Sequence, residues 1–327
     1  MRALVLSSTG GPELAVVGDA PEPSGAHPWA DGQRLLVEVH AAAVAFPDLL
    51  QSRGQYQHGA PAPYVVGGEY AGVVLEAPPG SRFSPGDRVA GLSVWGALAD
   101  RVLAIPRHTV RIPDSMAWRE AAAFYLNYVT AAFTLRRAGF RDGESVLVHG
   151  AAGGVGTATL DLLRGRAAPS VAVVSSTVKA EVARAAGADE VLLTSADWSA
   201  EVRALTGHGV DVVVDPVGGD RVTASLRALD VGGRLLVVGF AGGEIPTVRL
   251  NRLLLRDLSV VGVALEPWEQ RHPGVAAELV AELEALAPRV RPVIGHELPF
   301  ERAAEAMLVL DRREALGKVV VTVRESR

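Results

Sequence analysis

The most informative stretch of the sequence is a short apolar run followed by a glycine-rich turn. It reads Ser145-Val146-Leu147-Val148-His149 and then Gly150-Ala151-Ala152-Gly153-Gly154-Val155-Gly156. The run predicts a buried strand, and the residues after the turn have helical composition. Glycines let the backbone approach a pyrophosphate, and a helix N-terminus offers free N–H groups and a favourable dipole. A glycine-rich turn is also common in plain loops, so its context matters. In this context it predicts a dinucleotide site that uses Gly150, Ala151, Gly153, Gly154, Val155 and Gly156.

Strand-like runs continue after the turn and alternate with segments that can form helices. They lie at Val146–His149, Val171–Val174, Val191–Leu193, Val210–Val214, Leu235–Val238 and Val260–Ala264. Continuous β-branched runs suit strands that are buried on both faces of a parallel sheet. The alternation predicts a Rossmann-type, doubly wound α/β domain with six parallel strands. One helix is expected over Arg119–Gly139, just before it.

The two ends of the chain have a different pattern of apolar residues and turn residues. From Met1 to about Met116, short apolar runs are separated by Pro and Gly, which predicts many short, mostly antiparallel strands. Near the C-terminus, helices are expected at Val275–Leu286 and Phe300–Asp311, and a closing strand at Lys318–Val323. Because the nucleotide domain already has six strands, we expect this closing strand to return to the first domain.

Composition excludes several functions. The 327 residues carry a net charge of −5 with no basic cluster, so nucleic acid is not expected as a partner. The absence of cysteine excludes disulfides, cysteine nucleophiles and thiolate metal sites, and suits a reducing cytoplasm. The run Met1–Leu6 is short for a signal peptide, and Ala121–Leu135 is shorter than the roughly 20 residues needed to cross a bilayer. We expect a cytoplasmic protein that does not enter membranes.

The end of the next strand indicates which cofactor binds. NAD-selective sites carry an acidic residue about 20 residues after the glycines, where it binds the ribose. This chain has Val173-Val174-Ser175-Ser176-Thr177-Val178-Lys179 there, without an acid. Hydroxyls and a cation suit a 2′-phosphate, so Ser175, Ser176 and Lys179 predict NADPH. The alternative is a helix N-cap serine beside a solvated lysine.

Two further turns follow strands four and five. They are Asp215-Pro216-Val217-Gly218-Gly219 and Gly239-Phe240-Ala241-Gly242. Ligands of doubly wound sheets sit at the carboxyl ends of the strands. Val217, Gly218, Phe240 and Ala241 are therefore further candidates for cofactor binding, with plain turn chemistry as the alternative.

With these motifs in order, the chain resembles the zinc-independent quinone oxidoreductase (zeta-crystallin-like) branch of the medium-chain dehydrogenase/reductase superfamily. The matching segments span nearly the whole chain. They are Phe46–Leu50, Arg53–Tyr56, Val66–Val73, Gly150–Gly156, Ala186–Asp189, Asp215–Gly219, Gly233–Leu235 and Gly317–Val320.

The resemblance implies a GroES-like catalytic domain from residues 1–122 and 266–327 around a Rossmann nucleotide-binding domain at 123–265. It also implies a homodimer formed along the last strand, here Ser259–Leu265. The catalytic zinc ligands of the superfamily fall at Ala45, Gly68 and Leu126, none of which can bind a metal. No metal is therefore expected, and Glu69 is expected to be a structural hydrogen-bond acceptor.

Three residues are candidates for the catalytic site by resemblance. Tyr56 occupies the tyrosine place of the Gly-x-Tyr segment, Thr130 resembles a threonine beside the nicotinamide, and Asp48 matches the family's aspartate. Each has a structural alternative: a core tyrosine, a threonine bonded to its own helix, and a turn or cap residue. His58 is expected to be a solvated loop residue. After the last strand, Leu265–Trp268 is expected to form a loop.

Together these features predict an NADPH-dependent, metal-free reductase of small quinones or α,β-unsaturated carbonyls. A 2-enoyl-thioester reductase is one alternative, for which Arg249, Arg252 and Arg256 offer a basic rim. A non-catalytic NADPH-binding sensor or crystallin-like protein is another.

Overall fold

The computed structural model describes residues 1–194 and 197–324. The chain forms two compact units. The first unit joins Met1–Val129 to the segment from Gly274 onward, and the second unit spans Thr130–Pro273.

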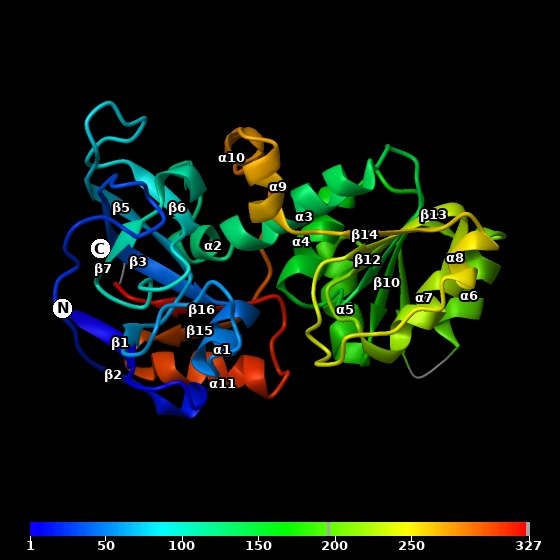
Figure 1. Ribbon diagram of the computed structural model, residues 1–327, viewed down its shortest axis with the longest axis horizontal. Helices are drawn as coiled ribbons and strands as arrows, with labels where there is room; N and C mark the ends of the chain where they lie inside the picture. The colour runs from blue at the N-terminus through cyan, green and yellow to red at the C-terminus, as the bar shows by residue number, and fades with distance from the viewer. Residues whose placement is uncertain (195–196, 325–327) are drawn as a thin grey trace. The chain divides into compact units, whose positions relative to one another are not determined.

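The second unit is built on a six-stranded parallel sheet (Figure 1). In chain order its strands are β9 (Val146–His149), β10 (Ser170–Val174), β11 (Glu190–Leu193), β12 (Val210–Asp215), β13 (Leu229–Val237) and β14 (Ser259–Gly262). Their spatial order is β11-β10-β9-β12-β13-β14. The chain therefore starts at the centre, builds out to one edge, and returns to build out to the other. The predicted doubly wound sheet is confirmed.

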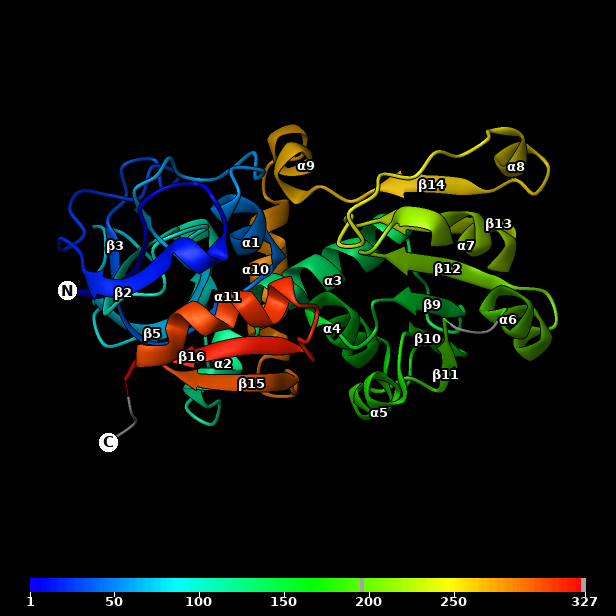
Figure 2. The same ribbon diagram turned by 90° about the horizontal axis from the view of Figure 1, so that it is seen from below.

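Helices cover both faces of this sheet, which explains why β9 and β10 are buried along their whole length. Helix α4 packs on α5, and α6 packs on α7 (Figure 2). The bounds are α4 Gly154–Leu163, α5 Thr177–Ala186, α6 Trp198–Thr206, η3 Gly219–Arg221, α7 Val222–Ala228 and α8 Asn251–Leu254. Because neither face of these inner strands is exposed to water, their sequences are continuous apolar runs.

The first unit is mostly antiparallel. Its larger sheet contains β15 (Ile294–Pro299), β16 (Lys318–Thr322), β3 (Leu35–Val44), β5 (Glu69–Glu76), β6 (Arg88–Leu92) and β8 (Thr109–Arg111), with β7 (Arg101–Ala104) also on β3. A small sheet holds β2 (Ala15–Asp19), β1 (Arg2–Leu6) and β4 (Tyr64–Val65). Strand β16 pairs antiparallel with β3, so the expected return of the closing strand is confirmed.

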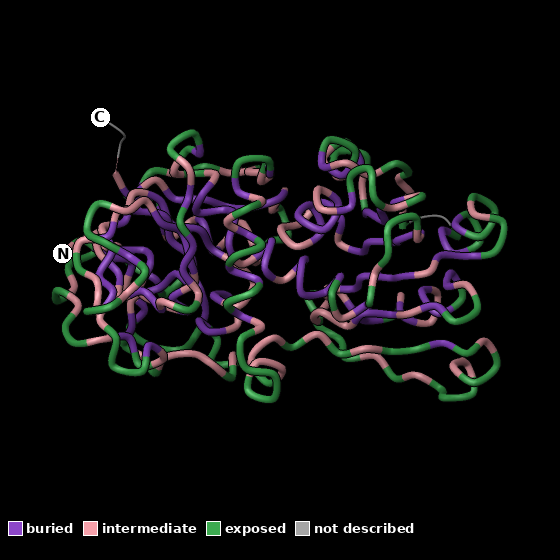
Figure 3. The backbone as a smooth tube through the Cα atoms, turned by 90° about the horizontal axis from the view of Figure 1, so that it is seen from above, coloured by how far each residue is buried: buried purple, intermediate pink, exposed green. Residues whose placement is uncertain are grey.

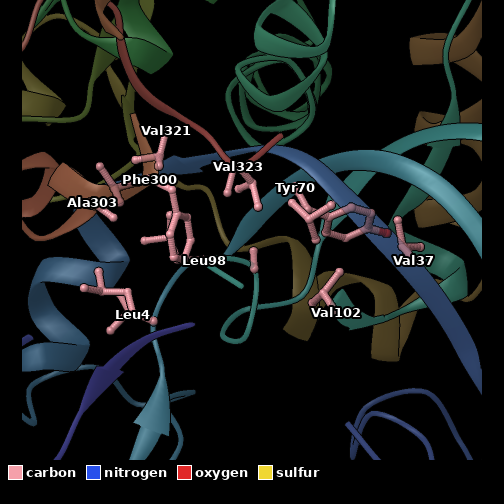
Figure 4. Close-up of a cluster of buried hydrophobic side chains, with 14 of the residues drawn as sticks. Leu4, Val37, Tyr70, Leu98, Val102, Phe300, Ala303, Val321 and Val323 are labelled. Atoms are coloured by element: carbon pink, nitrogen blue, oxygen red, sulfur yellow. The ribbon is translucent and has the colours of Figure 1, made fainter. Parts of the chain in front are cut away.

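The core of this unit joins side chains from both ends of the chain. Leu4 and Tyr70 come from the N-terminal part, whereas Phe300 and Val321 come from the C-terminal part, and all four are buried (Figure 4). The remaining helices are α1 (Phe46–Ser52), α2 (Trp118–Ala122), α10 (Val275–Leu286) and α11 (Ala303–Asp311), with short turns η1 (Pro12–Leu14), η2 (Pro106–His108) and η4 (Phe300–Arg302). The terminal segment is therefore part of the first unit's core.

The single helix expected over Arg119–Gly139 is wrong. The structure has α2 and then α3 (Tyr125–Ala138), separated at Ala123–Phe124. The backbone N–H of Leu126 donates to the Glu69 carboxylate, at 2.8 Å, so that N–H finds its partner outside the helix. A buried acceptor from β5 thus takes one of the donors that a new helix N-terminus leaves unsatisfied.

The loop expected at Leu265–Trp268 is also wrong, because helix α9 spans Leu265–Arg271. Trp268 anchors it. The Arg137 guanidinium lies 3.8 Å from the indole centroid, and the His272 ring lies 4.4 Å away. The cation–π and ring contacts favour a helix that holds both partners against one indole.

Burial is uneven along the second unit. Inner strands are buried, whereas β14 and the segment around α8 are largely exposed (Figure 3). The exposed apolar residues there are Ile245, Leu250, Leu254, Leu255 and Val260. Across the described residues, no helix combines the length and apolar character needed to span a membrane.

Candidate active site

The glycine turn joins β9 to α4 within a very tight space. Gly150 has φ +57°, where a side chain would be strained. A Cβ added at Gly156 would lie 2.3 Å from the Gly150 carbonyl oxygen, so only glycine allows this approach of helix to strand. Gly153 is the N-cap of α4 and supplies no side-chain cap. The first-turn N–H groups are thus available to an anion such as a pyrophosphate.

The side chains after β10 lie close together at the start of α5. The Lys179 ammonium donates to the Ser175 hydroxyl at 3.3 Å. Ser176 is the N-cap of α5, and its hydroxyl accepts from the Lys179 backbone N–H. Ser175 is exposed and Lys179 is half-buried. Ser176 therefore has the capping role that its sequence position also allowed, while Ser175 and Lys179 form a donor pair suited to a phosphate.

The loop after β12 is organised by Asp215. Its Oδ1 accepts from the backbone N–H groups of Val217 and Gly218, each at 2.9 Å. Burial raises the pKa of this carboxyl, and the two N–H donors oppose the rise. The Val217 side chain reaches the glycine turn, because its Cγ2 lies 3.0 Å from where a Gly150 Cβ would be. Two candidate cofactor loops are therefore in contact.

The loop after β13 contacts the loop after β12. Its Ala241 N–H donates to the Pro216 carbonyl at 3.1 Å. A Cβ at Gly218 would lie 2.8 Å from Cδ1 of Phe240, whose side chain is 36% exposed. The structure thus brings together the candidates after strands β9, β12 and β13. Their role in binding the cofactor stays a prediction.

Ala45, Gly68 and Leu126, where the resemblance places the zinc ligands, lie near two buried carboxyl groups of the first unit. Ala45 is the N-cap of α1, and its N–H donates to Asp48 Oδ2 at 2.7 Å. The position of a Gly68 Cβ is 3.5 Å from Asp48 Oδ1. Leu126 is joined to Glu69, the neighbour of Gly68, by the hydrogen bond described above. Hydrogen bonds to Asp48 and Glu69 therefore hold the backbone at two of these three positions, Ala45 and Leu126.

Asp48 is buried, with 2% of its surface exposed. Burial raises the pKa of its carboxyl to about 7, the nearby Glu69 raises it further, and the Ala45 N–H and the Lys318 charge lower it. Asp48 is the N3 residue of α1, and its carboxyl accepts from the N-cap backbone N–H of Ala45, as in a capping box. Asp48 thus has the cap geometry that the sequence allowed as an alternative to catalysis.

Glu69 forms a buried ion pair with Lys318. The Lys318 ammonium donates to Glu69 Oε2, while Oε1 accepts from Leu126. The side chains are 1% and 3% exposed. Burial raises the pKa of Glu69, and Lys318 opposes the rise. The expectation that Glu69 is a structural acceptor is confirmed, and its bonds join β5, β16 and the start of α3.

The other candidate residues are placed as follows. Tyr56 and His58 are half-buried in the loop after α1, with ring centroids 5.6 Å apart. Thr130 is half-buried in α3, and its carbonyl accepts from the Thr134 hydroxyl at 2.7 Å. Arg256 lies after α8 and donates to the Arg227 carbonyl at 3.1 Å. None of these contacts tests a catalytic role.

The sequence patterns did not predict a role for Lys318 or Gln51. Gln51 is a buried residue of α1 whose amide bonds two loops, at Val94 O and Ala60 N. One signal could have revealed Lys318. Of 32 basic residues only two are lysine, Lys179 and Lys318. In a chain that otherwise uses arginine, a lone lysine in a strand is a distinctive choice, because an ammonium is a compact point charge.

Two family models match the chain. The model for the GroES-like domain of alcohol dehydrogenases matches residues 31–114, and the model described as zinc-binding dehydrogenase matches residues 154–282. With the sheets described above, the predicted fold class, a GroES-like domain with a Rossmann-type domain, is confirmed.

Individual relatives extend the likeness over the whole chain. Quinone oxidoreductase-like protein 2 of Bos taurus is 36% identical over 297 residues, covering 89% of this chain and 85% of the relative. The quinone oxidoreductase of Rattus norvegicus is 32% identical over 331 residues, covering 98% and 97%. The quinone oxidoreductase of Thermus thermophilus, whose structures include a complex with NADPH, superposes with a TM-score of 0.81 at 33% identity, covering 99% of this chain and 100% of that chain.

Proposed function

Because the chain belongs to the quinone oxidoreductase branch of the medium-chain dehydrogenase/reductase superfamily, we propose that it reduces quinones or α,β-unsaturated carbonyls with NADPH and without a metal. The observation that carries the metal-free proposal is the trio Ala45, Gly68 and Leu126 at the three ligand places. Zinc needs three protein ligands and a water. Among the described residues, no group of three or more His, Cys, Asp or Glu side chains could hold a metal.

The chain is an NADPH-dependent oxidoreductase, and NADPH supplies a hydride when it is bound. The residues of the second unit fit that cofactor. We assign the pyrophosphate to the N–H groups that begin α4, and the 2′-phosphate to Ser175 and Lys179. The carrying observation is the side-by-side placement of the exposed Ser175 hydroxyl and the Lys179 ammonium.

At the acceptor, the chain's task is to orient a carbonyl and to stabilise the charge that grows on its oxygen. Tyr56 has a hydroxyl that can donate to this oxygen, and Thr130 has one that can help to orient the ring. Asp48 acts as a positioning residue, because its carboxylate holds the Ala45 N–H at the start of α1. One hydride and one solvent proton convert a quinone to a hydroquinone, so the electrons and protons balance.

The same proposal includes the limits of the two domains. The GroES-like domain takes residues 1–122 with 266–327, and the Rossmann domain takes residues 123–265. So does a homodimer along β14, supported by the exposed Leu250, Leu254 and Val260. The reducing cytoplasm is the proposed compartment, on the cysteine-free composition alone.

The test follows NADPH absorbance with 9,10-phenanthrenequinone and then with crotonyl-CoA, each with and without a strong chelator. We expect turnover with the quinone that the chelator leaves unchanged. Loss of activity with the chelator would contradict the metal-free proposal. Turnover with crotonyl-CoA alone would instead support the thioester reductase. Measurable NADPH binding without turnover of either compound would contradict both.

A further inference from the structure

The first unit contains a cavity that is lined by none of the residues assigned above to the cofactor, the acceptor or the buried ion pair. Its volume is about 810 Å³. Residues of β3, β15 and β16 line it, among them Ala41, Leu298 and Thr322, together with Trp118 at the start of α2. Sites for small molecules usually have volumes of about 300–1,000 Å³. We call this space the α2 cavity, and its size suits a small molecule.

The α2 cavity is separate from the buried carboxyl groups of the same unit. Ala41 pairs with Thr322, the last residue of β16, whereas Lys318, the partner of Glu69, is the first residue of that strand. Along the neighbouring strand, Ala45 follows Ala41 by four residues, which is roughly 13 Å at about 3.3 Å per residue. A ligand in the α2 cavity would therefore bind at a second site.

Three basic side chains that line the α2 cavity are short of hydrogen-bond partners. Arg119 Nη1 lies 3.8 Å from Glu297, and Arg324 Nη2 lies 3.5 Å from Glu38, but within the described part of the chain neither guanidinium donates a hydrogen bond. Arg324 Nε and His40 Nδ1 are shielded from solvent, and neither has a partner among the described residues. Polar atoms in this state are unfavourable, so an added acceptor would stabilise them.

The guanidinium of Arg2, which also lines the α2 cavity, is already bound. Its Nε and Nη2 donate to Asp100 Oδ1 at 3.2 and 3.1 Å, and Nη2 donates to the Val323 carbonyl at 3.0 Å. It also lies 4.8 Å from the Phe300 ring centroid and 3.5 Å from Glu301. Arg2 therefore joins the segments that line the cavity, and the other two guanidiniums keep their donors for a ligand.

The α2 cavity also has an apolar surface. Trp118 stacks on His40, with ring centroids 4.4 Å apart and 21° between the planes, and the Arg88 guanidinium lies 4.1 Å from the indole centroid. These contacts hold the indole and the imidazole in place. Leu298 and Pro299 add aliphatic groups to the lining. The cavity thus combines apolar side chains with cationic groups whose donors are free.

We propose that the α2 cavity binds a small organic anion. Its carboxylate or phosphate group is held by Arg119 and Arg324, and its apolar part contacts Trp118 and Leu298. A guanidinium presents a planar fork of N–H donors that matches both kinds of oxyanion. The site lies within the first unit and needs neither NADPH nor an acceptor, so this inference does not depend on the reaction proposed above.

The binding test uses the NADP⁺-loaded protein, because the bound cofactor occupies the phosphate sites proposed for the second unit. The carboxylate probe is 4-fluorobenzoate, followed by ¹⁹F NMR line width, and the phosphate probe is inorganic phosphate, followed by ³¹P NMR. We expect saturable binding of at least one probe. Binding of 4-fluorobenzoate alone assigns a carboxylate ligand, and binding of phosphate alone assigns a phosphorylated one. If neither probe binds saturably, the inference is wrong.

The decisive variant combines Arg119→Gln with Arg324→Gln, which removes both guanidiniums from positions that are not fully buried. Arg302→Gln is the matched control, because Arg302 is an exposed cation of the same unit that pairs with Glu305 and lies outside the α2 cavity. We expect the double variant to raise the Kd of the bound probe by about tenfold or more, and the control to stay within about twofold of the wild type. An unchanged Kd in the double variant would overturn the inference.

A measurement on the wild type locates the bound probe without depending on how the arginine variants fold. The chain has five tryptophans, and Trp118 is the one that lines the α2 cavity. With ¹⁵N-labelled tryptophan, the probe should shift the indole N–H signal of Trp118 more than any other indole signal. Loss of that signal in Trp118→Phe identifies it. A larger shift at another tryptophan would place the probe elsewhere and contradict the proposed site.

Discussion

At the residue scale, Lys179 tests the cofactor assignment. We expect Lys179→Ala to weaken NADPH binding by roughly 10- to 100-fold, the range for a lost charged hydrogen bond, and to change NADH binding little. Arg184→Ala is a suitable control, because it removes an exposed cation from the same helix α5. Kd values for both cofactors, from fluorescence titration, decide the matter. An equal effect on NADPH and NADH would remove the 2′-phosphate argument.

The lysine content offers an independent check. Lys318 is 3% exposed, so Lys179 is the only accessible lysine side chain of the chain. We expect NADPH, but not NADH, to slow its modification by trinitrobenzenesulfonate, as measured by peptide mass spectrometry. Equal protection by both cofactors would place the 2′-phosphate elsewhere.

Asp48 gives a prediction about pH and stability. Its folded pKa, about 7, is raised above the ordinary value of 3.8. Its contribution to stability is therefore fully present below about pH 4 and is lost as the pH rises through 7. His27 and His149, whose pKa values burial lowers to about 4 and about 3, act in the opposite direction. The Asp48 effect must therefore be read as a difference between two proteins.

The comparison is wild type against Asp48→Asn, by urea unfolding at several pH values. We expect the variant to gain stability relative to the wild type between pH 4 and 7, by up to a few kcal/mol. A stability difference that is flat across this range would mean that the Asp48 pKa is not raised.

At the scale of elements, the Glu69–Lys318 pair joins β5, β16 and α3. Removing one partner leaves a buried charge, so we expect Lys318→Met to lower the free energy of unfolding by about 3–5 kcal/mol. The double variant Glu69→Gln with Lys318→Met should recover most of that loss. The exposed pair Arg302–Glu305 is the control, and Arg302→Met should leave the free energy of unfolding nearly unchanged, because solvent screens this pair. If the double variant is no more stable than Lys318→Met, the pair is not coupled as the structure indicates.

The junction of β9 and α4 gives a second prediction at this scale. An added methyl at Gly156 would lie 2.3 Å from the Gly150 carbonyl oxygen, so the helix must move away from the strand. We expect Gly156→Ala to abolish NADPH binding and to lower stability by a few kcal/mol. Gly18→Ala serves as the control, because nothing lies within 4 Å of its added Cβ. Normal NADPH affinity in Gly156→Ala would mean that the turn does not bind the cofactor.

At the scale of the whole molecule, the exposed edge of the second unit bears on assembly. Leu254 and Leu255 are 82% and 76% exposed, next to the strand β14 that ends the sheet. Apolar patches of this kind mark interaction sites. We expect the wild type to be a dimer by light scattering, and Leu254→Glu with Leu255→Glu to be a monomer. Leu205→Glu, on α6, should stay dimeric, and a wild-type monomer would contradict the proposal.

Local sequence signals were enough to predict the order of the elements and the chemistry of the turn. The glycines of the turn, the β-branched runs and the helical segments between them are local signals, because each depends on backbone conformation and burial within a few residues. They predicted the six-stranded sheet, and Ser175 with Lys179 predicted the cofactor. The resemblance added Ala45, Gly68 and Leu126, whose side chains alone show that they cannot bind a metal.

Contacts between residues that are distant in the sequence became known from the folded structure. Lys318 pairs with Glu69, 249 positions away in the sequence, and Glu69 accepts a hydrogen bond from Leu126 at the start of α3. Three separate segments bring His40, Trp118 and Arg324 to one cavity. Such partners follow from strand pairing and loop closure across the fold, which no local pattern encodes. The cofactor is therefore predicted by local signals of the sequence, whereas these contacts between distant residues exist only in the folded chain.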